Sequence, residues 1–134
     1  MIDYEAVAEK AARDAVKMGY DLDYTPESID RLEEFLHAIH RIKDSSKLSD
    51  DLLWNVAVEY GIYFGQTLLK NKLSQLNWKW AELSDGLPVL QDTRKNHMSP
   101  ITKVYKRLIN GPEDSVNSYY EVSIAIATGE IKLP

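Results

Sequence analysis

A long apolar run in the middle of the sequence limits most strongly how this chain can fold. From Leu52 to Leu69 (LLWNVAVEYGIYFGQTLL), Glu59 is the only residue whose side chain is charged at neutral pH. Apolar residues occupy more than one helical face of the run, which is typical of a helix buried on most sides. Ser49 is a suitable N-cap, and the two aspartates that follow it favour a helix start. We therefore predict a central helix over residues 50–70.

The polar and small residues of this run indicate what surrounds it. A membrane-spanning helix would place three polar side chains in hydrocarbon, so we interpret the run as a helix of a soluble protein. These side chains are Asn55, Glu59 and Gln66. Small residues recur at spacings of four, at Ala57, Gly61 and Gly65. Because each interior glycine costs about 1 kcal/mol relative to alanine, we expect close packing there by an alanine-rich helix or by a sheet.

Capping residues and apolar stripes predict four further helices. Their expected ranges are residues 4–18 after Asp3, 26–43 after Thr25, 100–110 after Ser99 and 115–128 after Asp114. The alanine-rich face of the first helix is expected to pack against the small residues of the central helix. In the last range, alternating apolar residues are also compatible with a strand, although the cap, the length and Gly129 favour a helix.

The spacing of the apolar residues changes from a helical to an alternating pattern after the central helix. Residues 77–83 (NWKWAEL) alternate as in a β-strand, and residues 87–91 form a second short run after the turn signal at 84–86. Pro88 must lie at a strand start or on an edge, and a third short strand ends at Met98. We therefore predict an α+β fold, with about five helices around the central helix (50–70) and a two- or three-stranded antiparallel sheet within residues 76–98.

Composition limits the class of protein. The chain has 134 residues, of which 44% are hydrophobic, so one globular domain over residues 1–134 with a real core is expected. The absence of cysteine excludes disulfides, thiolate catalysis and cysteine-based zinc sites. The first residues carry charges where a signal peptide would have an apolar segment, so we expect a cytoplasmic protein.

Charge is distributed unevenly along the chain. The formal net charge is −5, which argues against nonspecific binding of nucleic acid. Residues 1–69 contain 7 basic and 14 acidic residues, whereas residues 70–107 contain 8 basic and 3 acidic residues. The acidic N-terminal part and the basic middle part are therefore the two electrostatic features that can recruit a charged partner.

A set of motifs over residues 60–115 resembles a known group of sequences. It consists of Gly61-x-Tyr63-x-Gly65, Trp78, Pro100, Val104-x-Lys106-Arg107-Leu108, Gly111 and Asp114-Ser115. This pattern is similar to that of small bacterial proteins of unknown function. The resemblance implies a small bacterial α+β domain, and it assigns no catalytic residue.

Two possible chemical sites have simple structural alternatives. His37 and His40 are three residues apart on the second predicted helix, but their angular positions place His37 on the solvent side and His40 at the border of the apolar stripe. A third ligand would have to come from His97 or a carboxylate, so we predict no metal and no cofactor. Glu59 can act as an acid or base if it is buried, and otherwise it belongs to an exposed stripe with Asn55 and Gln66.

Two groups of residues are candidates for binding. Trp78 and Trp80 share one face of the predicted strand, where they belong to the core or, if exposed, form a binding platform with Glu59 nearby. The second group is basic and comprises Arg94, Lys95, His97, Lys103, Lys106 and Arg107. The last three fall at helical spacings of three and four, so we expect them to form one solvated face that can bind an anion or an acidic partner.

No known catalytic motif occurs in the sequence, so we predict a non-enzymatic binding or protein-interaction module. In one hypothesis its acidic N-terminal surface binds a basic protein, as in an immunity- or antitoxin-like protein. In the alternative, the basic 94–107 surface binds an anion or nucleic acid, and in a third hypothesis the protein is an enzyme that uses a buried Glu59. A protein partner is favoured over nucleic acid, no membrane association is expected, and the oligomeric state stays open.

Overall fold

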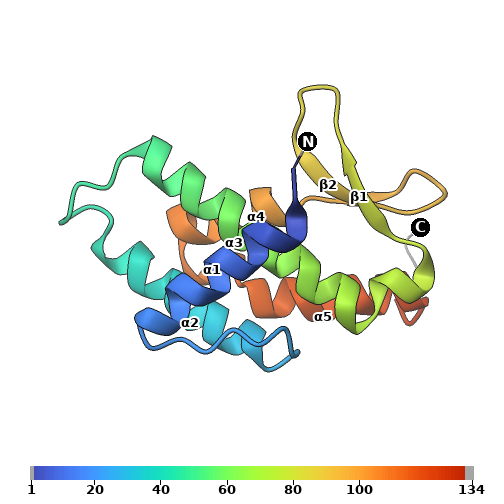
Figure 1. Ribbon diagram of the computed structural model, residues 1–134, viewed down its shortest axis with the longest axis horizontal. Coiled ribbons are helices and arrows are strands. Elements are labelled where there is room, and N and C mark those ends of the chain that lie inside the picture. Colours follow the sequence, from blue (N-terminus) through green and yellow to red (C-terminus); the bar gives the residue numbers. More distant parts are fainter. Residues whose placement is uncertain (1, 132–134) are drawn as a thin grey trace.

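The computed structural model describes residues 2–131. Its helices are α1 (Tyr4–Lys17), α2 (Ser28–Ile42), α3 (Asp50–Asn71), α4 (Pro100–Asn110) and α5 (Val116–Thr128), with two 3-10 turns, η1 (Leu73–Leu76) and η2 (Pro112–Asp114). The strands are β1 (Lys79–Glu82), β2 (Pro88–Gln91) and β3 (His97–Met98). Figure 1 shows α3 crossing the middle of the molecule, with the sheet near its C-terminal end and the α2–α3 loop at the opposite end. The predicted α+β fold, with five helices and a small antiparallel sheet, is confirmed.

Helix α3 is central, as its apolar sequence predicts. The Ser49 side chain accepts a hydrogen bond from the Leu52 amide and so caps the helix. Tyr60 and Phe64 are buried, and the Tyr60 hydroxyl donates to the Ala11 carbonyl oxygen of α1 at 3.0 Å. Because that carbonyl lies on the alanine-rich face of α1, this hydrogen bond fixes how the two helices pack.

The two glycines of α3 permit close packing by two different elements, α4 and the sheet. A Cβ atom at Gly61 would lie 2.5 Å from Cα of Ile101 in α4, and one at Gly65 would lie 2.5 Å from the Trp80 ring. The start of α4 and a side chain of the sheet therefore fill this face. Packing by the sheet, one of the two predicted alternatives, is found at Gly65, whereas Gly61 is covered by α4 and not by the alanine-rich helix α1, whose Ala11 carbonyl oxygen accepts from Tyr60.

Two predicted helix starts differ from the observed ones. Helix α2 begins at Ser28, because Thr25 and the two residues after it form a preceding turn in which the Thr25 hydroxyl accepts from the Ser28 amide. Helix α5 is capped by Ser115, whereas Asp114 lies in η2 and forms an ion pair with Lys103. The range 115–128 is helical, so the strand alternative for it is wrong.

The sheet has the order β1–β2–β3, and both strand pairs are antiparallel. Pro88 is the first residue of the central strand, the position at which its missing amide proton is tolerated. Trp78 lies one residue before β1, so the predicted strand 77–83 is shorter than expected. Within residues 2–131, none of the helices is long and apolar enough to cross a membrane.

Candidate functional site

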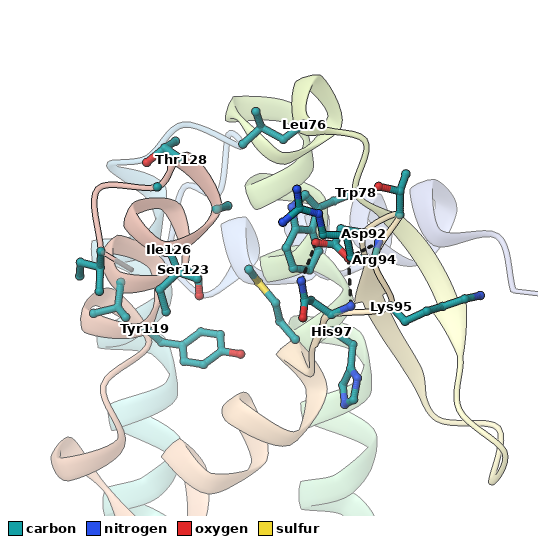
Figure 2. A pocket seen from close by; sticks show the side chains of 17 residues that line it. Leu76, Trp78, Asp92, Arg94, Lys95, His97, Tyr119, Ser123, Ile126 and Thr128 are labelled. Carbon is teal, nitrogen blue, oxygen red and sulfur yellow. Dashed lines mark hydrogen bonds between the residues drawn. The ribbon is translucent and has the colours of Figure 1, made fainter. Parts of the chain in front are cut away.

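A groove lies between α5 and the segment that joins β2 to β3. Its volume is about 1080 Å³. Figure 2 shows its two walls, with Tyr119, Ser123 and Ile126 of α5 on one side and Asp92, Arg94, Lys95 and His97 on the other. The remaining lining residues are Leu76, Trp78, Thr93, Asn96, Met98, Val122, Ala127, Thr128, Gly129 and Ile131.

Trp78 lies deep between these walls because of the way the chain leaves η1. Asn77 has a left-handed backbone with φ of 64°, and the Trp78 amide donates to the Leu73 carbonyl oxygen at 3.1 Å. Asparagine adopts this conformation more readily than most residues. The resulting turn directs the chain into β1 and leaves the Trp78 side chain 8% exposed beside the groove.

The β2–β3 turn is organised by one carboxylate. Asp92 Oδ1 accepts from the Arg94 and Asn96 amides, each at 2.9 Å, and Oδ2 accepts from Asn96 Nδ2 at 3.0 Å. Partial burial opposes ionisation, but the hydrogen bonds from Asn96 and Arg94 hold the pKa of the Asp92 carboxyl below its usual range. Asp92 is therefore an ionised structural residue, with both oxygens occupied by the turn.

Helix α5 supplies a largely apolar wall, to which Tyr119, Ser123 and Thr128 contribute hydroxyl groups. Val122 of this wall is 46% exposed. Burial raises the pKa of the Tyr119 hydroxyl, and Ser123 is buried next to it on the following turn. This wall presents apolar surface to solvent and has few polar groups, as ligand grooves commonly do.

Three of the predicted binding residues lie together on the opposite wall. Arg94, Lys95 and His97 are exposed and line the groove. Within residues 2–131, neither Arg94 nor Lys95 forms an ion pair. Their charges are therefore available to a ligand.

The other three predicted basic residues do not form a solvated face, so that prediction is wrong. Arg107 is only 2% exposed, and Lys103 Nζ is bound to Asp114 Oδ1 at 3.0 Å with 17% of its side chain exposed. Lys106 alone is exposed. Arg107 lies beside the apolar stripe of α4, one turn after the buried Val104, and it is buried because Glu33 and His37 of α2 pack against it.

The buried guanidinium of Arg107 belongs to a charged cluster that sequence reasoning missed. Its Nε donates to Glu33 Oε2, and its Nη2 lies 2.9 Å from His37 Nδ1. Glu33 Oε1 in turn accepts from the Val116 amide at 2.8 Å and from the Ser115 hydroxyl at 3.1 Å, at the start of α5. One carboxylate therefore joins α2, α4 and the N-terminus of α5, where a negative charge is favourable.

The two histidines of α2 are structural. An arginine nitrogen can only donate, so His37 Nδ1 accepts from Arg107. His37 therefore faces α4, and the prediction that it lies on the solvent side is wrong. A carbonyl oxygen can only accept, so His40 Nδ1 donates to Leu108 O at 2.7 Å. No group of metal-ligating residues occurs in the described part of the chain.

The binding platform that the sequence suggested for Trp78, Trp80 and Glu59 is not present. The Glu59 side chain is 35% exposed and pairs with Lys10 Nζ at 3.3 Å, so the hypothesis of an enzyme that uses a buried Glu59 is wrong in its premise. Trp80 stacks on Tyr4 with a centroid distance of 4.4 Å, and its Nε1 donates to Gln66 Oε1 at 2.8 Å. Trp80 therefore holds the sheet against α1 and α3.

A smaller pocket lies on the other side of α5, against the start of α2. Its volume is about 290 Å³, and its lining residues are Pro26, Glu27, Ile29, Asp30, Asn117, Tyr120 and Glu121. Three of them are exposed acids: Glu27, Asp30 and Glu121. Burial raises the pKa of the Tyr120 hydroxyl, which keeps it neutral beside these carboxylates.

No protein-family model, curated protein or solved structure matches this chain. Its function is therefore inferred from the site itself.

Proposed function

We propose that this protein is a non-enzymatic binding module, and that its groove between α5 and the β2–β3 segment binds an acidic segment of another protein. One observation carries the proposal: apolar surface on α5 lies across one groove from Arg94, and Lys95, a second cation without an ion pair in the described residues, lies on the same turn with its side chain extending away from α5. Apolar side chains of a partner would bury against Val122 and Ile126, and its carboxylates would lie near the cations.

The size and charge of the groove favour a protein segment over other ligands. Its volume of about 1080 Å³ lies at the upper end of the range of about 300–1,000 Å³ that is typical of small-molecule pockets, so an extended protein segment fits into it. Nucleic-acid binding depends on neutralising many phosphates. A chain of net charge −5, with two unpaired cations in this groove, is poorly suited to that task.

Blocking the groove tests this function. Val122→Arg places a long charged side chain on the apolar wall, and Val16→Arg is a matched control because Val16 is an apolar helix residue that is 55% exposed on α1. We expect Val122→Arg to abolish retention of a partner from extracts of the native cell, and Val16→Arg to retain it.

Crosslinking then identifies the chemistry of the bound segment. A zero-length carbodiimide reagent joins lysine amines to carboxylates in contact with them. We expect Lys95 to crosslink to an acidic segment of the partner, and the exposed Lys106 of α4 to remain unmodified. Equal crosslinking at both lysines, or full retention by Val122→Arg, would contradict the assignment of the groove.

A second candidate function is favoured by the acidic pocket. Glu27, Asp30 and Glu121 surround the apolar surface of Ile29 and Tyr120, an arrangement that suits the aliphatic stem and charged end of a lysine or arginine. This pocket supports the hypothesis of an immunity- or antitoxin-like protein that binds a basic partner. Asp30→Asn combined with Glu121→Gln should then release a basic partner, whereas Glu9→Asn combined with Glu34→Gln, at exposed acids outside the pocket, should not.

A further inference from the structure

One edge of the sheet borders the groove. β3 is the last strand in the order β1–β2–β3, and within residues 2–131 no strand pairs with its outer edge. Asn96, His97 and Met98 all line the groove, opposite the apolar wall of α5. An outer strand edge presents backbone donors and acceptors to which another extended chain can bind.

The register identifies which backbone groups face outward. The Asp92 amide donates to the Asn96 carbonyl oxygen at 3.0 Å, so these two residues form a hydrogen-bonded pair. Bonded and non-bonded pairs alternate along antiparallel strands. Gln91 and His97 are therefore a non-bonded pair, and Leu90 and Met98 are a bonded pair. The amide and carbonyl groups of His97 consequently point away from β2, along the outer edge.

From this edge we infer that the occupant of the groove binds as an extended segment, which adds a fourth strand to the sheet through the backbone of His97. The inference rests on the proposed function of the groove and specifies how its ligand is held. Strand addition of this kind takes affinity from main-chain hydrogen bonds and specificity from alternate side chains.

The two faces of the added strand would meet different chemistry. Met98 is buried together with its cross-strand neighbour Leu90, so alternate side chains of the segment would lie on this face and against Val122 of α5. His97 is exposed on the other face, close in sequence to Arg94 and Lys95. The expected ligand therefore alternates apolar and acidic residues.

A scan of backbone methylation in a peptide tests this binding mode. The probe is a short synthetic peptide of alternating valine and glutamate, and its affinity for the full chain is measured by fluorescence anisotropy. Methylating an amide that donates to β3 removes one hydrogen bond, which should weaken binding by about fivefold. Methylation of the other amides should have little effect, so the loss should be confined to the one amide that donates to the His97 carbonyl oxygen.

A matched pair of variants tests the same contact from the protein side. His97→Pro removes the amide proton that points away from β2, and proline is tolerated on strand edges. His97→Ala removes the imidazole and keeps the amide. We expect the proline variant to bind the peptide about fivefold more weakly than the alanine variant.

The outcomes separate this inference from the function on which it rests. Binding of the peptide without loss on methylation at any single amide would overturn strand addition and leave the groove as a binding site. A lack of binding by the unmodified peptide, together with full partner retention by Val122→Arg, would overturn both. If His97→Pro does not fold, the methylation scan decides alone, because it leaves the protein unchanged.

Discussion

Two parts of the basic middle region have similar composition and opposite structural roles. Arg94 and Lys95 lie on an exposed turn, without ion-pair partners in the described part of the chain, and line the groove. Lys103 and Arg107 lie on α4, where Asp114 and Glu33 neutralise them and Arg107 is buried. A cluster of basic residues in a sequence is therefore not yet a basic surface.

The difference follows from where each group lies relative to the apolar stripe of its element. A guanidinium on the buried face of a helix needs a paired and hydrogen-bonded environment, because an isolated buried charge is costly. Glu33 and His37 provide that environment for Arg107. A turn has no buried face, so its cations keep their hydration and remain free to bind a ligand.

The largest loss of stability is expected from a substitution that breaks the buried pair of Arg107 and Glu33. Arg107→Leu leaves Glu33 without its cation, and removing one partner of a buried ion pair costs about 3–5 kcal/mol. Urea denaturation should therefore show a large loss of the free energy of unfolding. Lys106→Leu, on the same helix but exposed, should change it by less than about 0.5 kcal/mol. Equal effects of the two substitutions would contradict the burial of Arg107.

The next largest loss of stability is expected where the start of α4 packs on α3, between the two basic regions. Ile101 is the second residue of α4, shortly after β3 ends at Met98, and its backbone packs on Gly61. Gly61→Ala should lower the free energy of unfolding by about 1–3 kcal/mol, because overpacking against backbone outweighs the helix propensity of alanine. At Gly65 the clash is with the Trp80 side chain, which can move, so Gly65→Ala should cost less. Thermal unfolding of both variants distinguishes these cases, and a more stable Gly61→Ala variant would show that α4 does not approach α3 so closely.

A smaller effect is expected in the pH dependence of the free energy of unfolding, to which one carboxylate of each region, Asp92 and Asp114, contributes. Hydrogen bonds from Asn110 and Lys103 lower the pKa of the Asp114 carboxyl, and the pKa of Asp92 is lowered as well. The unfolded chain then binds more protons, so this stabilisation is present above the usual pKa of 3.8 and is lost as the pH falls below it. Asp114→Asn and Asp92→Asn should each flatten the fall of the free energy of unfolding between pH 4 and pH 2 (about the range in which these carboxyls titrate). An unchanged slope in either variant would contradict its ionised pairing.

Local signals were sufficient to predict most of the helices. Ser49 and Asp3 accept the hydrogen bonds expected of N-caps, and the glycine after α5 has the left-handed φ of a helix end. Such caps act within one turn of the chain, so they can be read from neighbouring residues. The predicted resemblance to small bacterial proteins and the cytoplasmic location remain predictions.

The candidate site was less accessible to sequence reasoning, because it depends on distant contacts. Glu33 and Arg107 are 74 residues apart, and no local pattern indicates that they would pair. The groove exists because α5 and the β2–β3 turn stand apart in space, which residue types along one element do not encode. Sequence reasoning did identify Arg94, Lys95 and His97 as candidates, since turn residues remain exposed in most folds.

Charge reversal tests most directly the claim that the groove binds an acidic segment through Arg94 and Lys95. Arg94→Glu combined with Lys95→Glu is compared with Arg41→Glu combined with Lys106→Glu, which changes the same residue types at exposed sites on α2 and α4. Binding of the alternating valine–glutamate peptide should fall by about tenfold in the first variant and weaken with added salt in the wild type. Equal binding by both variants, independent of salt, would contradict the claim.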